Sequence, residues 1–108
     1  MPRRPDKYTY RVTWSDDDHE YVGLCAEFPS LSWLEQTPER ALQGIRRLVQ
    51  RSVTDLMRRK ESLPEPIAAR SYSGKFVVRV PPHVHRTLAM QAAEAGVSLN
   101  RLVSSKLV

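Results

Sequence analysis

The last third of the chain contains one predicted strand and two short helices, which is too little structure to fold alone. Within residues 75–80, Phe76, Val78 and Val80 recur at every second position, so they share one face of an extended segment. Units much below about 40 residues seldom fold without help. We therefore expect two copies of the chain to pair these strands antiparallel and to bury the apolar faces.

Two helix signals follow the strand. Pro81 and Pro82 suit the start of a helix, and Gly96 suits its end as a left-handed cap. Ser98 is placed to cap a second helix. The predicted dimer core combines the strand with residues of both helices: Phe76, Val78, Val80, Leu88 and Leu102.

The exposed side of such a paired ribbon is suited to double-stranded DNA, since the major groove is about 12 Å wide and admits a two-stranded ribbon. Lysine and arginine can donate hydrogen bonds to guanine, and valine can contact a thymine methyl. Free N–H groups at the start of the second helix can hold a phosphate. The predicted DNA-binding residues are Lys75, Val77, Arg79, Ser98, Leu99 and Asn100. The alternative interpretation of this face is the solvent side of an ordinary strand.

Charge supports the DNA interpretation. The chain has a formal net charge of +5, and residues 71–108 hold five basic residues against Glu94 alone. Residues 1–70 hold 12 basic and 11 acidic residues and are nearly neutral. The basic excess would attract a polyanion to the rear segment. The arginines of the front segment are interpreted as a solvated helix face.

The front segment predicts a small antiparallel sheet with one long helix. Alternating residues at 8–14 and 20–27 flank a polar turn, and a short extended piece follows at 31–34. Thr37 and Pro38 mark the start of an amphipathic helix. Its apolar residues recur every three or four positions: Leu42, Ile45, Leu48, Val49, Val53, Leu56 and Met57. We expect Trp14 and Cys25 in the core, and the position of Trp33 remains open.

Residues 61–74 are rich in proline, serine and glycine and predict a linker with one edge strand near Ile67. The expected organisation is α+β, with one domain at 1–70 and a second at 71–108. With a single cysteine and no run of about 18 apolar residues, we expect a cytoplasmic protein without a membrane span.

The ordered motifs resemble the HicB family of antitoxins, whose tail is an Arc/MetJ-like ribbon-helix-helix domain. The segments that carry the resemblance are residues 20–23, 27–31, 37–42, 73–82 and 96–100. The resemblance implies a front domain similar to a partial RNase H fold without nuclease activity. It also implies that this domain neutralises a small RNA-cleaving toxin of the HicA type, while the rear domain represses its own operon.

The chain departs from many family members after Pro29. Residues 30–34 read Ser-Leu-Ser-Trp-Leu, where those members have Asp-Leu-Pro-Gly-Cys. The candidate toxin contacts are Phe28, Pro29, Leu31 and Trp33. The expected partners are operator DNA, a HicA-like toxin and a second copy of the chain, and further pairing into tetramers stays open because a hairpin edge invites it.

Two other functions are weighed against the antitoxin. A stand-alone ribbon-helix-helix repressor would use its front domain to bind an effector or to drive oligomerisation. An enzyme would need carboxylates from separate elements around a metal ion, but Asp16, Asp17 and Asp18 are adjacent in one turn. His83 and His85, two positions apart, do not share a helix face. We expect no catalytic residue, no metal and no cofactor.

Overall fold

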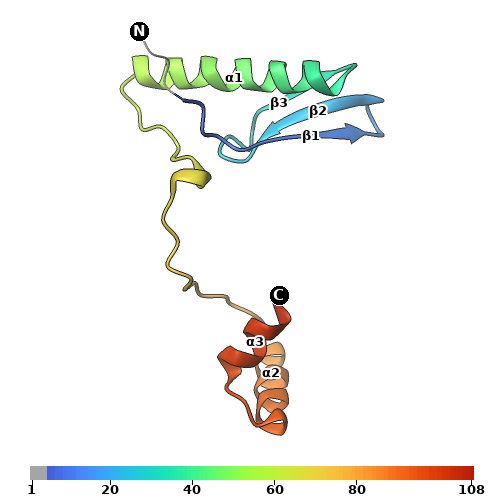
Figure 1. Cartoon of the computed structure of the whole chain (residues 1–108), viewed down its shortest axis with the longest axis vertical. Coiled ribbons are helices and arrows are strands. Elements are labelled where there is room, and N and C mark those ends of the chain that lie inside the picture. The colour runs from blue at the N-terminus through green and yellow to red at the C-terminus, as the bar shows by residue number, and fades with distance from the viewer. Residues whose placement is uncertain (1–4) are drawn as a thin grey trace. The chain divides into compact units, whose positions relative to one another are not determined.

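The chain folds as two compact units, which are described separately (Figure 1). In the computed structural model, which describes residues 5–108, the first unit ends at Tyr72 and the second begins at Ser73. The first unit contains a three-stranded antiparallel sheet and one long helix, and the second contains two shorter helices. The predicted α+β class is therefore confirmed.

The sheet of the first unit consists of β1 (Tyr10–Ser15), β2 (Glu20–Cys25) and β3 (Ser32–Glu35), in the order β1-β2-β3. Both neighbouring pairs are antiparallel. The predicted hairpin and the predicted third extended piece are both present, with ends that shift by one or two residues. The alternation of apolar residues was therefore a sufficient signal for this sheet.

The long helix α1 (Pro38–Arg58) lies across one face of the sheet (Figure 1). Its start is capped as the sequence predicts, because the Arg40 N–H donates to Thr37 Oγ1 at 3.2 Å. Its buried residues are Ala41, Gly44, Ile45, Val49 and Val53. Leu42 and Met57, expected on the same face, are instead 37% and 56% exposed.

Two glycines let α1 approach the sheet closely. A Cβ added at Gly23 would lie 2.5 Å from the Ala41 carbonyl oxygen, and one added at Gly44 would collide with the Trp33 indole. Ile45 and Val49 are fully buried beside these contacts, and Cys25 is buried with them as predicted. The core of the first unit is therefore formed where the helix backbone meets β2.

Trp14 is not in the core, contrary to the prediction. Its side chain is 48% exposed, stacks edge-on against Tyr21 at 5.1 Å between ring centroids, and donates from Nε1 to Asp16 Oδ1 at 3.3 Å. Trp14 and Tyr21 are paired in the sheet, two positions closer to the hairpin turn than Gly23. Because α1 meets the sheet at Gly23, the end of the hairpin remains uncovered.

The predicted edge strand near Ile67 is wrong, because residues Ile67–Ala69 form a short 3-10 helix, η1. The Ile67 N–H donates to Glu27 Oε2 at 2.9 Å, and the Tyr8 hydroxyl donates to the Pro64 carbonyl at 2.9 Å. The Ala69 and Arg70 N–H groups donate to the Pro66 and Ile67 carbonyls at 3.0 and 3.2 Å, so the backbone turns on itself instead of extending along the sheet. The contacts with Glu27 and Tyr8 hold the linker against the first unit instead.

Glu27 is the centre of this attachment. Besides Ile67, it accepts from the Thr9 N–H at 2.9 Å and from Thr9 Oγ1 at 3.1 Å. Burial raises the pKa of Glu27, but the hydrogen bonds from the Ile67 and Thr9 N–H groups lower it more, so the pKa of Glu27 lies below its usual value. The charged carboxylate therefore stabilises the folded first unit.

Glu27→Gln should lower the free energy of unfolding of the first unit by about 1 kcal/mol at neutral pH, since hydrogen bonds to a charged acceptor are replaced by neutral ones. With a lowered native pKa, the wild-type stabilisation is present above the unfolded pKa of about 4.3 and is lost as the pH falls below it. The variant should therefore lose less stability than wild type in this acid range.

Urea unfolding at neutral and acid pH, followed by tryptophan fluorescence, measures both effects, because both tryptophans are in the first unit. Glu65→Gln is the control, as Glu65 is exposed and its carboxylate contacts only Arg70, at 3.9 Å, among the ion pairs of residues 5–108. Equal acid sensitivity of wild type and Glu27→Gln would contradict the assigned role of the carboxylate.

The second unit contains α2 (Pro82–Ala95) and α3 (Leu99–Lys106). Both predicted caps are confirmed: Gly96 ends α2 with a φ of 68°, and Ser98 Oγ accepts from the Arg101 N–H at 3.1 Å. Residues 75–80 form no strand within one chain, because no segment among residues 5–108 pairs with them. The strand at 75–80 stays a prediction that depends on a second copy.

Candidate nucleic-acid interface

The segment at residues 75–80 exposes most of its apolar surface. The exposed fractions are 74% for Phe76, 91% for Val77, 65% for Val78 and 41% for Val80. The adjoining α2 buries only Ala92, and α3 has no fully buried residue. A contiguous apolar surface of this kind marks an interaction site.

A groove of about 770 Å³ lies between this segment and the two helices of the second unit. Its apolar lining consists of Phe76, Val78, Val80, Leu88, Leu99, Val103 and Leu107. Four of the five predicted dimer-core residues thus line one groove, and the fifth, Leu102, is half-buried outside its lining. The groove brings together the side chains that would need a partner.

The predicted DNA-binding residues fall into two groups. Lys75, Val77 and Arg79 are exposed on the segment, although Lys75 and Arg79 also border the groove. The start of α3 holds the others: Ser98 caps the helix, Leu99 is half-buried in the groove and Asn100 is exposed. The side chain of Leu99 is thus turned to the groove, and its contribution to a phosphate site would come from the backbone N–H.

The positive charges of the second unit are not neutralised internally. Every ion pair that the structure shows among residues 5–108 lies in the first unit. Lys75, Arg79, Arg86, Arg101 and Lys106 therefore remain available to an anionic partner. This arrangement suits phosphate groups, which provide most of the affinity in protein–DNA contacts.

The candidate toxin contacts in the first unit lie mostly against the core. Phe28 packs edge-on against Tyr8 at 5.2 Å between ring centroids, and Leu31 and Trp33 are half-buried against the same core. Pro29 is exposed. The exposed apolar residue nearby is Leu34, which is 43% exposed and was not among the predicted contacts. Its position next to Trp33 in β3 places it on the opposite sheet face.

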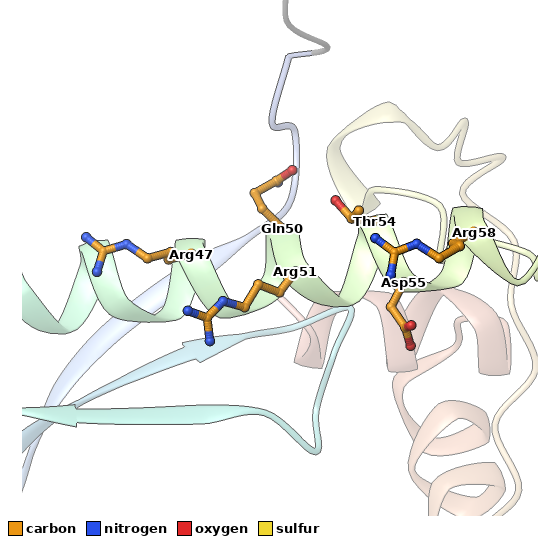
Figure 2. Close-up of a pocket in the computed structure, with 6 residues that line it drawn as sticks. All are labelled: Arg47, Gln50, Arg51, Thr54, Asp55 and Arg58. Carbon is orange, nitrogen blue, oxygen red and sulfur yellow. The ribbon is translucent and has the colours of Figure 1, made fainter.

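A row of arginines on α1 was also missed as a candidate site. Arg47, Arg51 and Arg58, with Gln50, Thr54 and Asp55, line a shallow depression of about 380 Å³ (Figure 2). The available signal was their spacing of four and seven positions, which places arginines on one side of a helix. The prediction treated them as a solvated face.

Residues 5–108 contain neither a cluster that could hold a metal ion nor a helix that could span a membrane. Within residues 5–108, no three side chains of histidine, cysteine, aspartate or glutamate lie close enough together to hold a metal ion. No helix in this part of the chain has the length and apolar character needed to cross a membrane.

Comparison with known proteins points to one family. No curated protein and no solved structure matches the chain. The model of the HicB family matches residues 59–107, which run from the end of α1 through the linker and nearly all of the second unit. This match supports a HicB-family protein, and over these residues the chain is similar to that family.

Proposed function

We propose that the protein is the antitoxin of a type II toxin–antitoxin system. Its first unit would bind and neutralise a small HicA-like RNA-cleaving toxin, and its second unit would repress its own operon as a ribbon-helix-helix dimer. The observation that carries the proposal is the exposed apolar segment at residues 75–80, within the part of the chain that matches the HicB family. The proposal assigns no catalytic activity to the chain.

A second copy of the chain would complete the second unit. Antiparallel pairing of two segments would give strand partners to the backbone N–H and C=O groups of residues 76–80, which pair with no strand among residues 5–108. The same pairing would cover Phe76, Val78 and Val80. A contiguous exposed apolar surface is expected to be covered by a partner. Among homo-oligomers, the two-fold dimer is the commonest arrangement that does so.

The opposite side of the paired ribbon would then face DNA. Val77 is nearly fully exposed, and Lys75 and Arg79 have no ion-pair partner among the described residues. A ribbon in the major groove can present arginine to the O6 and N7 atoms of guanine. The backbone at the start of α3 would contact a phosphate and fix the register.

Arg79→Ala should weaken binding to the DNA upstream of the protein's own gene by about 1–3 kcal/mol, or roughly 5- to 150-fold, if Arg79 contacts a base. Fluorescence anisotropy at one salt concentration measures the change. Arg86→Ala removes the same charge from an exposed position of α2 and is the matched control. Equal weakening by the two substitutions would indicate general charge attraction and contradict a base contact by Arg79.

Toxin neutralisation is tested by purifying the tagged full chain from its native cell and identifying co-purified proteins by mass spectrometry. The expected result is a partner of under about a hundred residues, encoded beside the antitoxin, whose expression arrests growth unless this chain is co-expressed. Binding to upstream DNA without any such partner would contradict the antitoxin role and identify a stand-alone repressor.

A further inference from the structure

Four arginines lie along the solvent side of α1. Arg40, Arg47, Arg51 and Arg58 are separated by seven, four and seven positions, so they follow one line along the helix. All four are exposed, whereas the sheet contacts the opposite side of the helix. These four residues are named the arginine stripe.

The arginines of the stripe form no ion pair within residues 5–108. Three other arginines of the first unit are paired: Arg46 contacts Asp6 at 3.5 Å, Arg59 contacts Asp55 at 3.2 Å and Glu61 at 3.1 Å, and Arg70 contacts Glu65 at 3.9 Å. None of the stripe arginines forms an ion pair with a described residue. Asp55 is the one carboxylate that lines the depression beside the stripe, and it is engaged by Arg59.

The side chains around the stripe are suited to hydrogen-bond an anion. Figure 2 shows the Arg47 and Arg51 side chains extending in the same direction along α1, and Thr54 beside the Arg58 side chain. Gln50 also lines the depression. No apolar residue lines this depression. The core of a protein–protein interface is apolar and often aromatic, whereas phosphate contacts use arginine together with glutamine and threonine. The lining therefore fits a phosphate backbone better than a protein.

We propose that the arginine stripe binds the phosphate backbone of double-stranded DNA beside the operator. This inference rests on the proposed function, because the second unit would bring the DNA to the first. The distance along the helix from Arg47 to Arg58 is roughly 16 Å, and a duplex offers about one phosphate per 1.7 Å of its axis. Tethering to an operator-bound second unit would raise the effective concentration of DNA at the stripe.

The test compares full-length wild type with the variant Arg47→Gln/Arg51→Gln/Arg58→Gln on a random-sequence DNA duplex of about 30 base pairs. Anisotropy titrations between about 50 and 200 mM salt give the salt dependence of affinity. Loss of three phosphate contacts should reduce the slope of log K against log salt by about 2.7. The wild type should then lose about 40-fold more affinity over this salt range than the variant.

The control variant Lys7→Gln/Arg11→Gln/Lys60→Gln removes the same charge from three exposed positions outside the stripe, none of which forms an ion pair with a described residue. It should keep the wild-type slope, and tryptophan fluorescence should show that both variants retain the folded first unit. Arg47→Lys/Arg51→Lys/Arg58→Lys retains the charge and should keep most of the slope. An equal decrease in slope for the stripe variant and the control would overturn the proposal.

Further variants separate this inference from the proposed function. One outcome is that Lys75→Gln/Arg79→Gln binds the duplex as wild type does while the stripe variant binds it less well. This outcome would support DNA binding by the arginine stripe and contradict DNA binding by the ribbon of residues 75–80. If the stripe variant keeps the wild-type slope, the stripe is refuted and the ribbon is unaffected. Stripe-dependent binding that favours an RNA duplex or poly-glutamate over the DNA duplex would also overturn the proposal, in favour of an RNA or an acidic protein.

Discussion

Val78→Asp should separate the proposed dimer into monomers and abolish measurable binding to the proposed operator. Val78 lines the apolar groove of the second unit and is 65% exposed in a single chain. In the proposed dimer it would be covered, and a buried unpaired carboxylate costs several kcal/mol. We expect the dimer dissociation constant to rise by about 1,000-fold, which corresponds to about 4 kcal/mol.

Val77→Asp is the matched control, with the same substitution one position away on the other face. Val77 is 91% exposed and faces DNA in the proposed ribbon. This variant should remain a dimer yet bind operator DNA weakly, because its carboxylate would repel phosphates. Analytical ultracentrifugation gives the oligomeric state and anisotropy the DNA affinity. Two dimeric variants, or two monomeric ones, would contradict the proposed assignment of faces.

Local signals were enough to predict most elements of this fold. Thr37 and Ser98 cap their helices through bonds to N–H groups three positions further on, and Gly96 ends α2 in a left-handed conformation. Each of these features depends on a few adjacent residues. The hairpin likewise follows from alternation within β1 and β2, whose partners are close in sequence.

Long-range contacts account for the errors in the first unit. Glu27 binds the Ile67 N–H across 40 positions, and nothing near Ile67 in the sequence indicates that contact. Trp14 is a residue type common in small cores, but its exposure depends on where α1 meets the sheet. That meeting point is set by Gly23, which contributes no hydrophobic signal to a sequence pattern.

The candidate site was predicted only in part, for two different reasons. The alternation at residues 75–80 identifies an apolar face, but no described residue pairs with this segment, and the surface proposed to cover it belongs to a second copy of the chain. For α1, the prediction relied on the nearly neutral sum of charges over residues 1–70. In the structure, Arg46 and Arg59 form ion pairs, whereas Arg47, Arg51 and Arg58 form none with the described residues. A summed charge therefore concealed a local excess.

Gly23→Ala should be among the most destabilising single substitutions in the first unit. The added Cβ would lie 2.5 Å from the carbonyl oxygen of Ala41 and 2.8 Å from Ile45 Cγ2. A backbone oxygen cannot rotate away, so α1 would have to shift from the sheet. We expect a loss of about 3 kcal/mol in the free energy of unfolding, at the upper end for overpacked cores. Urea unfolding followed by tryptophan fluorescence measures it.

Gly44→Ala is the informative comparison, because it adds the same methyl group from the other side of the helix–sheet contact. Its Cβ would collide with the Trp33 indole rather than with backbone, and this indole packs against the core and donates from Nε1 to Glu35 Oε1 at 3.1 Å. Alanine favours the helix over glycine by about 1 kcal/mol, which offsets part of the cost of moving the indole. We therefore expect Gly44→Ala to cost about 2 kcal/mol, less than Gly23→Ala. If Gly23→Ala had the same free energy of unfolding as wild type, α1 would not lie against β2 at this position.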